Sequence, residues 1–186
     1  MFSPLLLWLP ILVSAVLVFL LSSVIHMLSP WHKSDYPLLP NEGAVMDALR
    51  PLGIPEGEYM APRPATRADM KSPEFAERMK RGPVFIMTIM PNGGMSMGRN
   101  LVLWFLYLIV VATFAGHIAQ GASVRSGDSP VLAHTVGLAA FMAYSFALWQ
   151  MTIWYRRPWL TTLKATIDGL LYAIVTAAVF VWLWPK

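Results

Sequence analysis

Four long apolar runs constrain the fold of this chain more than any other feature of its sequence. Each is close to the roughly 20 apolar residues that a helix needs to cross a bilayer. The backbone of a segment in lipid must satisfy its own hydrogen bonds, which a helix does within itself. We therefore predict an all-α membrane protein with four transmembrane helices, at about residues 5–27, 101–120, 131–153 and 165–184.

The composition also indicates that a bilayer surrounds the chain. The chain is 56% hydrophobic with a mean hydropathy of +0.55, and only 13% of its residues are charged, about half of the ~25% typical of soluble domains. We expect one integral membrane domain over residues 1–186. The net charge of +4 comes from basic residues beside the apolar runs, so it does not indicate a nucleic-acid partner. The absence of Cys excludes disulfides, thiolate metal sites and a Cys nucleophile.

The first apolar run, Leu5–Met27, could be an uncleaved anchor or a signal peptide. Met1–Pro4 carries no Lys or Arg, the run is longer than a typical signal-peptide core, and no Ala-x-Ala site follows it. We therefore predict that this run is an uncleaved membrane helix.

The polar stretch between the third and fourth runs sets the expected orientation. It carries Arg156, Arg157 and Lys164 beside several Trp and Tyr side chains, and Pro158 keeps the two runs from forming one helix. Basic residues next to a span stay on the cytoplasmic side. This side collects twelve of the fourteen Lys and Arg residues. We predict a cytoplasmic loop over residues 28–100 and both termini on the opposite side.

The loop at 28–100 is the only large polar segment, and we expect short helices on the membrane surface within it. One is predicted from Asn41, as its N-cap, through Arg50. A second begins at Ser72, followed by a Pro and an acid, and runs to Arg81. Residues 57–71 are predicted to be irregular. Residues 83–91 are apolar but too short to span, so they form either a strand-like piece or an interfacial segment.

Lys164 and Asp168 form the first candidate site, because they lie one helical turn apart on the same face. The structural interpretation is a pair in which Lys164 offsets the desolvation of the acid while its ammonium group extends to water. The functional interpretation is a proton or cation acceptor that opens to the cytoplasm. We favour the structural interpretation.

The four histidines fall into two pairs by depth. His26 and His32 lie at the cytoplasmic end of the first helix, whereas His117 and His134 lie near the outer ends of the second and third. Two imidazoles at one depth could hold a haem or a metal ion. No second pair stands at a matching place, so we predict no cofactor and treat His117 and His134 as interfacial side chains.

Rows of small residues indicate close helix packing. Gly169, Ala173 and Ala177 recur every fourth position in the fourth run, and similar rows occur in the second and third. Such rows let helix backbones approach closely in lipid. We expect the last three helices to form the core, and the first helix to pack at the edge with Ser14, Ser22 and Ser23 bonding inward.

Three segments together resemble a family of small bacterial inner-membrane proteins of uncharacterised function. They are His26–Tyr36, Arg157-Pro-Trp and Ile167-Asp-Gly-Leu, and the likeness in layout covers most of the chain. The resemblance implies a location in the bacterial inner membrane. Together with the orientation predicted from the basic residues, this makes the termini periplasmic. It implies no activity, cofactor or site.

The sequence lacks a Walker loop, a Gly-x-Ser-x-Gly elbow and a His-Glu-x-x-His motif, so we predict that the protein is not an enzyme. The first functional hypothesis is an accessory or scaffold subunit of a membrane complex, with a membrane-protein partner or a second copy of the chain bound. The alternative is a small carrier or channel, or a haem- or metal-binding electron-transfer protein.

Overall fold

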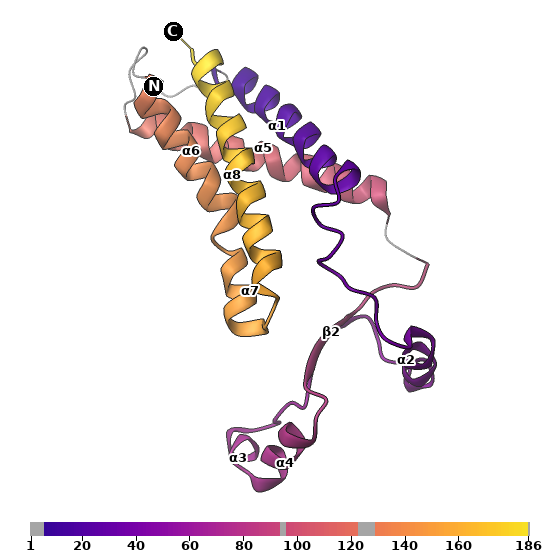
Figure 1. Cartoon of the computed structure of the whole chain (residues 1–186). Helices are drawn as coiled ribbons and strands as arrows, with labels where there is room; N and C mark the ends of the chain where they lie inside the picture. The colour runs from indigo at the N-terminus through magenta and orange to yellow at the C-terminus, as the bar shows by residue number, and fades with distance from the viewer. Residues whose placement is uncertain (1–5, 94–95, 123–128, 186) are drawn as a thin grey trace. The chain divides into compact units, whose positions relative to one another are not determined.

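The computed structural model describes residues 6–93, 96–122 and 129–185. The chain divides into two compact units, one made of Met1–Pro37 with Ser96–Lys186 and the other of Leu38–Met95. The first unit holds the long helices of Figure 1. Four of its helical segments are long and apolar enough to cross a membrane, namely Trp8–Leu28, Met97–Gly121, Ser129–Tyr155 and Trp159–Leu183. The prediction of a mainly helical chain with four helices able to cross a membrane is confirmed.

The first and third spans each contain a break in regular α-helix. Helix α1, Trp8–Ser23, continues into a π-helical turn, Val24–Leu28. The third span consists of α6, Ser129–Ser145, and α7, Leu148–Tyr155. The second span is the single helix α5, Met97–Gly121.

The connection between α7 and α8 is shorter than the sequence indicates. Helix α8 covers Trp159–Leu183 and begins directly after Pro158, while Arg156 has a left-handed backbone that ends α7. The fourth helix was predicted to begin near residue 165, because the charge of Lys164 was assigned to the loop. Lys164 and Asp168 therefore both lie within α8, farther from its start than predicted.

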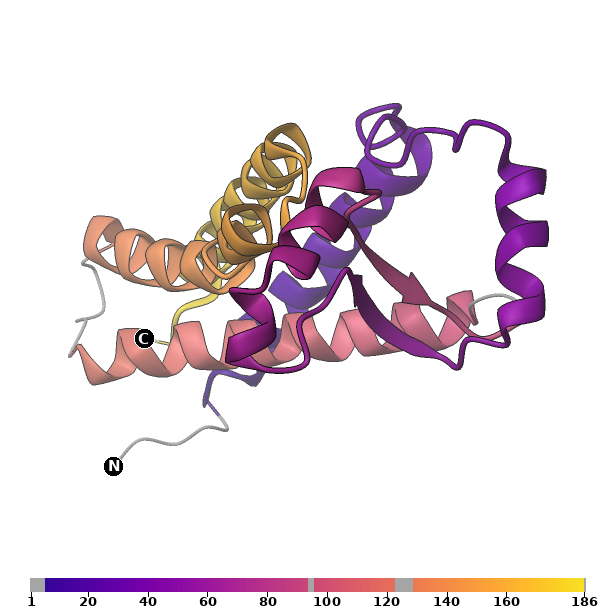
Figure 2. The ribbon, with the colours of Figure 1, turned by 90° about the horizontal axis from the view of Figure 1, so that it is seen from below.

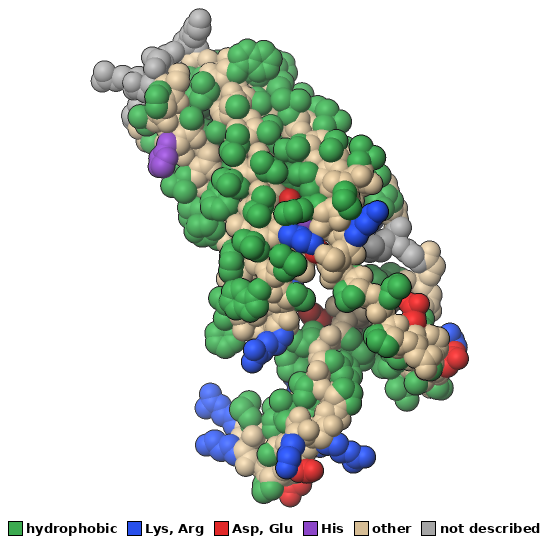
Figure 3. All heavy atoms as spheres, viewed as in Figure 1, with side chains coloured by type: hydrophobic (Ala, Val, Ile, Leu, Met, Phe, Trp, Pro, Cys, Tyr) green, Lys and Arg blue, Asp and Glu red, His purple; other side chains and the backbone are tan. Residues whose placement is uncertain are grey.

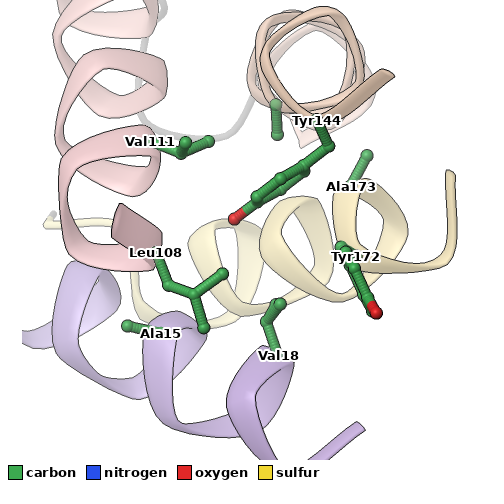
Figure 4. Close-up of a cluster of buried hydrophobic side chains, with 8 residues drawn as sticks. Ala15, Val18, Leu108, Val111, Tyr144, Tyr172 and Ala173 are labelled. Atoms are coloured by element: carbon green, nitrogen blue, oxygen red, sulfur yellow. The ribbon is translucent and has the colours of Figure 1, made fainter. Parts of the chain in front are cut away.

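The four spans surround a common core in which α1 contacts α5 and α8, and α6 contacts the same two helices. Figure 4 shows Val18 of α1, Leu108 of α5 and Tyr144 of α6 meeting in this core. Ala15 and Val18 are each 1% exposed, so the prediction that the first helix packs at the edge is wrong. Its small Ala and Ser side chains, among the larger Leu and Val, allow this close approach.

The serines of α1 form hydrogen bonds mostly within their own helix. Ser22 accepts a hydrogen bond from Trp104 Nε1 of α5 at 2.9 Å, as an inward-facing serine should. Ser14 is fully buried, but its hydroxyl donates to Ile11 O within the same helix. Ser23 likewise donates to Phe19 O. Only Ser22 among the three bonds to another helix.

Small residues mark the closest helix contacts. A Cβ atom added at Gly169 of α8 would collide with Ser145 Oγ of α6, and one added at Gly116 of α5 would lie 2.8 Å from the ring of Phe180. The outer surface of the bundle carries large apolar side chains, which dominate Figure 3. Such a surface is suited to lipid tails, since its side chains need no hydrogen-bond partners from the solvent.

The unit at Leu38–Met95 contains short elements. They are α2, Glu42–Leu49, with a 3-10 turn at Arg50–Leu52; β1, Gly57–Ala61; α3, Arg67–Met70; α4, Pro73–Arg81; and β2, Phe85–Ile89. The two predicted helices are present as α2 and α4. The strand alternative for residues 83–91 is the one that forms, because β1 and β2 pair antiparallel with Tyr59 opposite Met87 (Figure 2).

Two local predictions for this unit are wrong. Residues 57–71 are not irregular, since they form β1 and the short α3, which Thr66 and Asp69 cap reciprocally. Asn41 does not cap α2 through its side chain and instead has a left-handed backbone. Ser72 does cap α4, where its hydroxyl oxygen accepts from the Phe75 N–H at 3.1 Å.

Candidate functional site

The candidate site lies where the segment that follows α1 turns back onto α8. The π-helical turn ends at Leu28, and Ser29 is extended. Its hydroxyl donates to Ile25 O at 2.6 Å and accepts from the Trp31 N–H at 3.2 Å. After this turn, the side chains of Trp31, His32, Ser34 and Asp35 face Lys164 or Asp168 of α8.

Asp168 is the most deeply buried charged group of the site, at 3% exposure. Its Oδ1 accepts a hydrogen bond from Trp31 Nε1 at 3.1 Å, and its Oδ2 lies 2.8 Å from His32 Nε2. A buried carboxylate is costly unless such partners replace water. Both oxygens therefore have partners in the segment after α1.

Lys164 is also buried, at 7% exposure, and its ammonium group uses all three of its donors. They bond to Trp31 O at 2.7 Å, Ser34 Oγ at 2.8 Å and Asp35 Oδ1 at 3.0 Å. The predicted Lys164–Asp168 pair is therefore replaced by separate partners for each residue. Lys164 does not extend to water, because the turn at residues 31–35 covers it.

His32 connects the two carboxylates of the site. Its Nδ1 lies 2.7 Å from Asp35 Oδ2, and its Nε2 lies 2.8 Å from Asp168 Oδ2. Burial alone would raise the pKa of Asp35, but hydrogen bonds with His32 and Lys164 outweigh burial and hold the pKa of this carboxyl below its ordinary value. Asp35 is thus an ionised partner for both the lysine and the imidazole.

His26 completes the group from the π-helical turn of the first span. Its ring stacks on His32, with centroids 4.4 Å apart and planes 12° from parallel. Its Nδ1 lies 3.0 Å from Ser22 O, which can only accept, so Nδ1 is the donor and the neutral ring carries its lone pair on Nε2. One ligand atom from each of His26, His32 and Asp168 lies within 4.8 Å of the others.

The site thus brings together His26, His32, Lys164 and Asp168. The sequence indicated them only as two separate pairs, one of histidines and one of a lysine and an acid. Sequence reasoning missed Trp31, Ser34 and Asp35. The sequence does offer one signal for them, since Asp35 stands three residues after His32 in a short polar segment beside a span. Such an acid is placed to orient the imidazole.

The outer histidines do not belong to this group. His117 and His134 are exposed on α5 and α6. His134 lines an open apolar groove of about 700 Å³ between α6 and α8, and His117 does not. Among the described residues, the cluster of three potential metal ligands includes neither of them.

Comparison with known proteins adds no assignment to this geometry. No protein-family model, curated protein or solved structure matches the chain. The functional argument therefore depends on the residues and contacts of the chain itself.

Proposed function

We propose that the protein is a non-enzymatic subunit of a membrane complex, in which residues 38–95 dock on another membrane protein. The observation that supports this proposal is the lack of a core in that unit. None of its described residues, 38–93, is buried. A two-stranded sheet is at best marginally stable alone, so a unit of this kind gains stability when another surface covers it.

One face of the sheet is the best candidate for that contact. Paired residues lie on the same face of a sheet, and successive residues alternate between faces. The register therefore places five apolar side chains together, which we call the apolar face. It consists of Tyr59, Ala61, Phe85, Met87 and Ile89. The opposite face carries Glu58 and Thr88 with Met60 and Ile86.

The charge of the unit favours a protein surface over lipid headgroups. Residues 38–95 contain seven Lys or Arg and seven Asp or Glu. Segments that bind the anionic cytoplasmic leaflet do so through an excess of basic residues. This unit has no such excess, so its apolar face is better suited to an apolar protein surface than to a charged lipid surface.

The charges near the span ends support a cytoplasmic location for this unit. Lys33, Arg99, Arg156 and Arg157 stand beside the four span ends that share its side of the membrane. The positive-inside rule places that side in the cytoplasm and the termini in the periplasm of a bacterial inner membrane.

A photo-crosslinking residue at Ile89, on the apolar face, tests the docking proposal in intact cells. Thr88 on the opposite face provides the matched control, since it is the adjacent position. We expect the Ile89 variant to form one defined adduct with a different integral membrane protein, and the Thr88 variant to form much less. The reciprocal crosslink, from the identified partner, should return this chain.

Three outcomes contradict the proposal. Equal adducts from both positions would mean that contact does not depend on the apolar face. An adduct of the chain with itself would identify a homo-oligomer. Crosslinks to lipid or within the same chain would mean that the unit rests on the membrane or on its own helices.

A further inference from the structure

We propose that His26, His32 and Asp168 bind a divalent first-row transition-metal ion such as Zn²⁺. Imidazole nitrogens and a carboxylate oxygen are ordinary ligands of these ions, and two His with one acidic residue leave a further position open for water or another ligand. The site is independent of the proposed docking function, because every residue that forms it belongs to the helical unit.

The positions of the ligand atoms fit one ion after a small adjustment. They lie within 4.8 Å of one another, whereas two nitrogens on opposite sides of one zinc ion are at most about 4.2 Å apart, given Zn–N bonds of about 2.0–2.1 Å. The His26 side chain is exposed, so packing does not hold its ring on every side and its side-chain torsions can change. The two stacked rings would tilt so that both lone pairs point at the ion.

Each proposed ligand already has the hydrogen bond that a metal ligand requires on its other side. Metal-bound histidines almost always donate their second ring N–H to a carboxylate or a carbonyl, which orients the ring. Here Nδ1 of His26 meets Ser22 O, and Nδ1 of His32 meets Asp35 Oδ2. The second oxygen of Asp168 is held by Trp31 Nε1. Residue type alone would not produce these three supporting bonds.

The charges of the site also favour a bound cation. Lys164 and Asp35 form an ion pair with each other. Among the described residues, no Lys or Arg forms an ion pair with Asp168. The one side chain that could pair with it as a cation is His32, and only if its imidazole is protonated. With neutral imidazoles the site therefore carries one uncompensated negative charge in a buried place, which is costly near a membrane. A divalent ion would remove that cost.

The backbone at His26 is the last supporting feature. His26 lies in the π-helical turn Val24–Leu28, and π-helical turns inside α-helices occur frequently at functional sites. The competing explanation is a latch in which His32 alone carries a proton between two carboxylates. That explanation gives no role to His26, its hydrogen bond or its stacking on His32.

The test uses the full chain in detergent, stripped with a chelator and then loaded with Zn²⁺. After removal of free metal, elemental analysis should find about one zinc per chain. Competition with a chromophoric chelator should show at least a tenfold loss of affinity in His26→Ala and in Asp168→Asn. Because the His26 ring is exposed, His26→Ala should keep the helical circular dichroism and elution volume of the parent protein.

The matched control is His134→Ala, which removes an exposed imidazole from another helix and should leave zinc affinity unchanged. Co²⁺ supplies a second readout, since its visible absorption bands should appear in the parent protein and disappear in His26→Ala. The proposal is overturned if the folded parent binds no zinc, if His26→Ala binds it as tightly as the parent, or if His134→Ala is the variant that loses it. A folded parent without zinc would support the proton latch, and neither result affects the docking proposal.

Discussion

At the scale of single residues, Lys164 has the largest expected effect on stability. Its ammonium group is buried and bonds to Trp31 O, Ser34 Oγ and Asp35 Oδ1. We expect Lys164→Ala to lower the free energy of unfolding by about 3–5 kcal/mol, since it removes the lysine that is ion-paired with the Asp35 carboxylate. Asp168→Asn should cost less, because an amide oxygen still accepts from Trp31 and a neutral group is less costly to bury.

Thermal unfolding in mild detergent, without added metal, measures this ranking. Arg99→Ala is a suitable control, because Arg99 is an exposed basic residue of the same unit and surface changes usually stay within about 0.5 kcal/mol. If Asp168→Asn were the more damaging of the two, the carboxylate and not the lysine would be the main support of the turn at residues 31–35.

At the scale of elements, the contact between α6 and α8 depends on the absence of a side chain at Gly169. An added Cβ would meet Ser145 Oγ and lie 3.1 Å from Tyr144 Cβ. We expect Gly169→Ala to destabilise the protein by about 1–3 kcal/mol, as overpacking does. Gly98→Ala is the control, since nothing lies within 4 Å of a Cβ there.

A double variant tests whether Ser145 Oγ is the cause. This hydroxyl is buried and has no hydrogen-bond partner among the described residues, so Ser145→Ala alone should have little effect. In Gly169→Ala with Ser145→Ala, much of the lost melting temperature should return. If the losses of melting temperature in the two single variants simply added in the double variant, the clash would instead be with Tyr144 or with the backbone.

Elements that depend on their own sequence could be predicted, and those that depend on distant partners could not. The four spans follow from apolar length alone, and Ser72 with Pro73 marks the start of α4 through a local cap. Strand β1 was missed because its partner, β2, lies 24 residues beyond its end in the chain. The edge position assigned to α1 failed for a related reason, since composition alone does not show which neighbours a helix meets.

The candidate site shows the same limit. Apolar runs fix the depth of His26, His32, Lys164 and Asp168, and this placed all four at one end of the bundle. The depth of a residue in the bundle does not determine which side chains it bonds to. A helix face suggested that Lys164 would meet Asp168, but the turn of residues 31–35 supplies closer partners to both. Only a structure shows that a segment outside the spans completes the site.

At the scale of the whole molecule, the orientation of the four spans decides which cellular compartment residues 38–95 and the proposed metal site face. Only charges near the span ends weigh strongly in this decision. Lys33, Arg99, Arg156 and Arg157 stand at one set of ends, and Arg125 stands between the second and third spans at the other. Lys164 is buried within α8 and is not a loop charge. The other basic residues still give the cytoplasmic set of span ends more positive charge than the opposite set.

We therefore expect a reporter fused after Lys186 to face the periplasm. Alkaline phosphatase, which needs export, should be active there, and a green fluorescent protein fused at the same point should be dark. Both reporters inserted after Gly93, in the loop between the first and second spans, should give the reverse pattern.

Replacing Arg156 and Arg157 with Ala should weaken this preference for a periplasmic C-terminus, since both are at least partly exposed charges within the α7–α8 connection. A bright C-terminal fluorescent fusion would show the inverted orientation. The apolar face of residues 38–95 would then meet a periplasmic surface, and the proposed metal site would draw its ion from the periplasm.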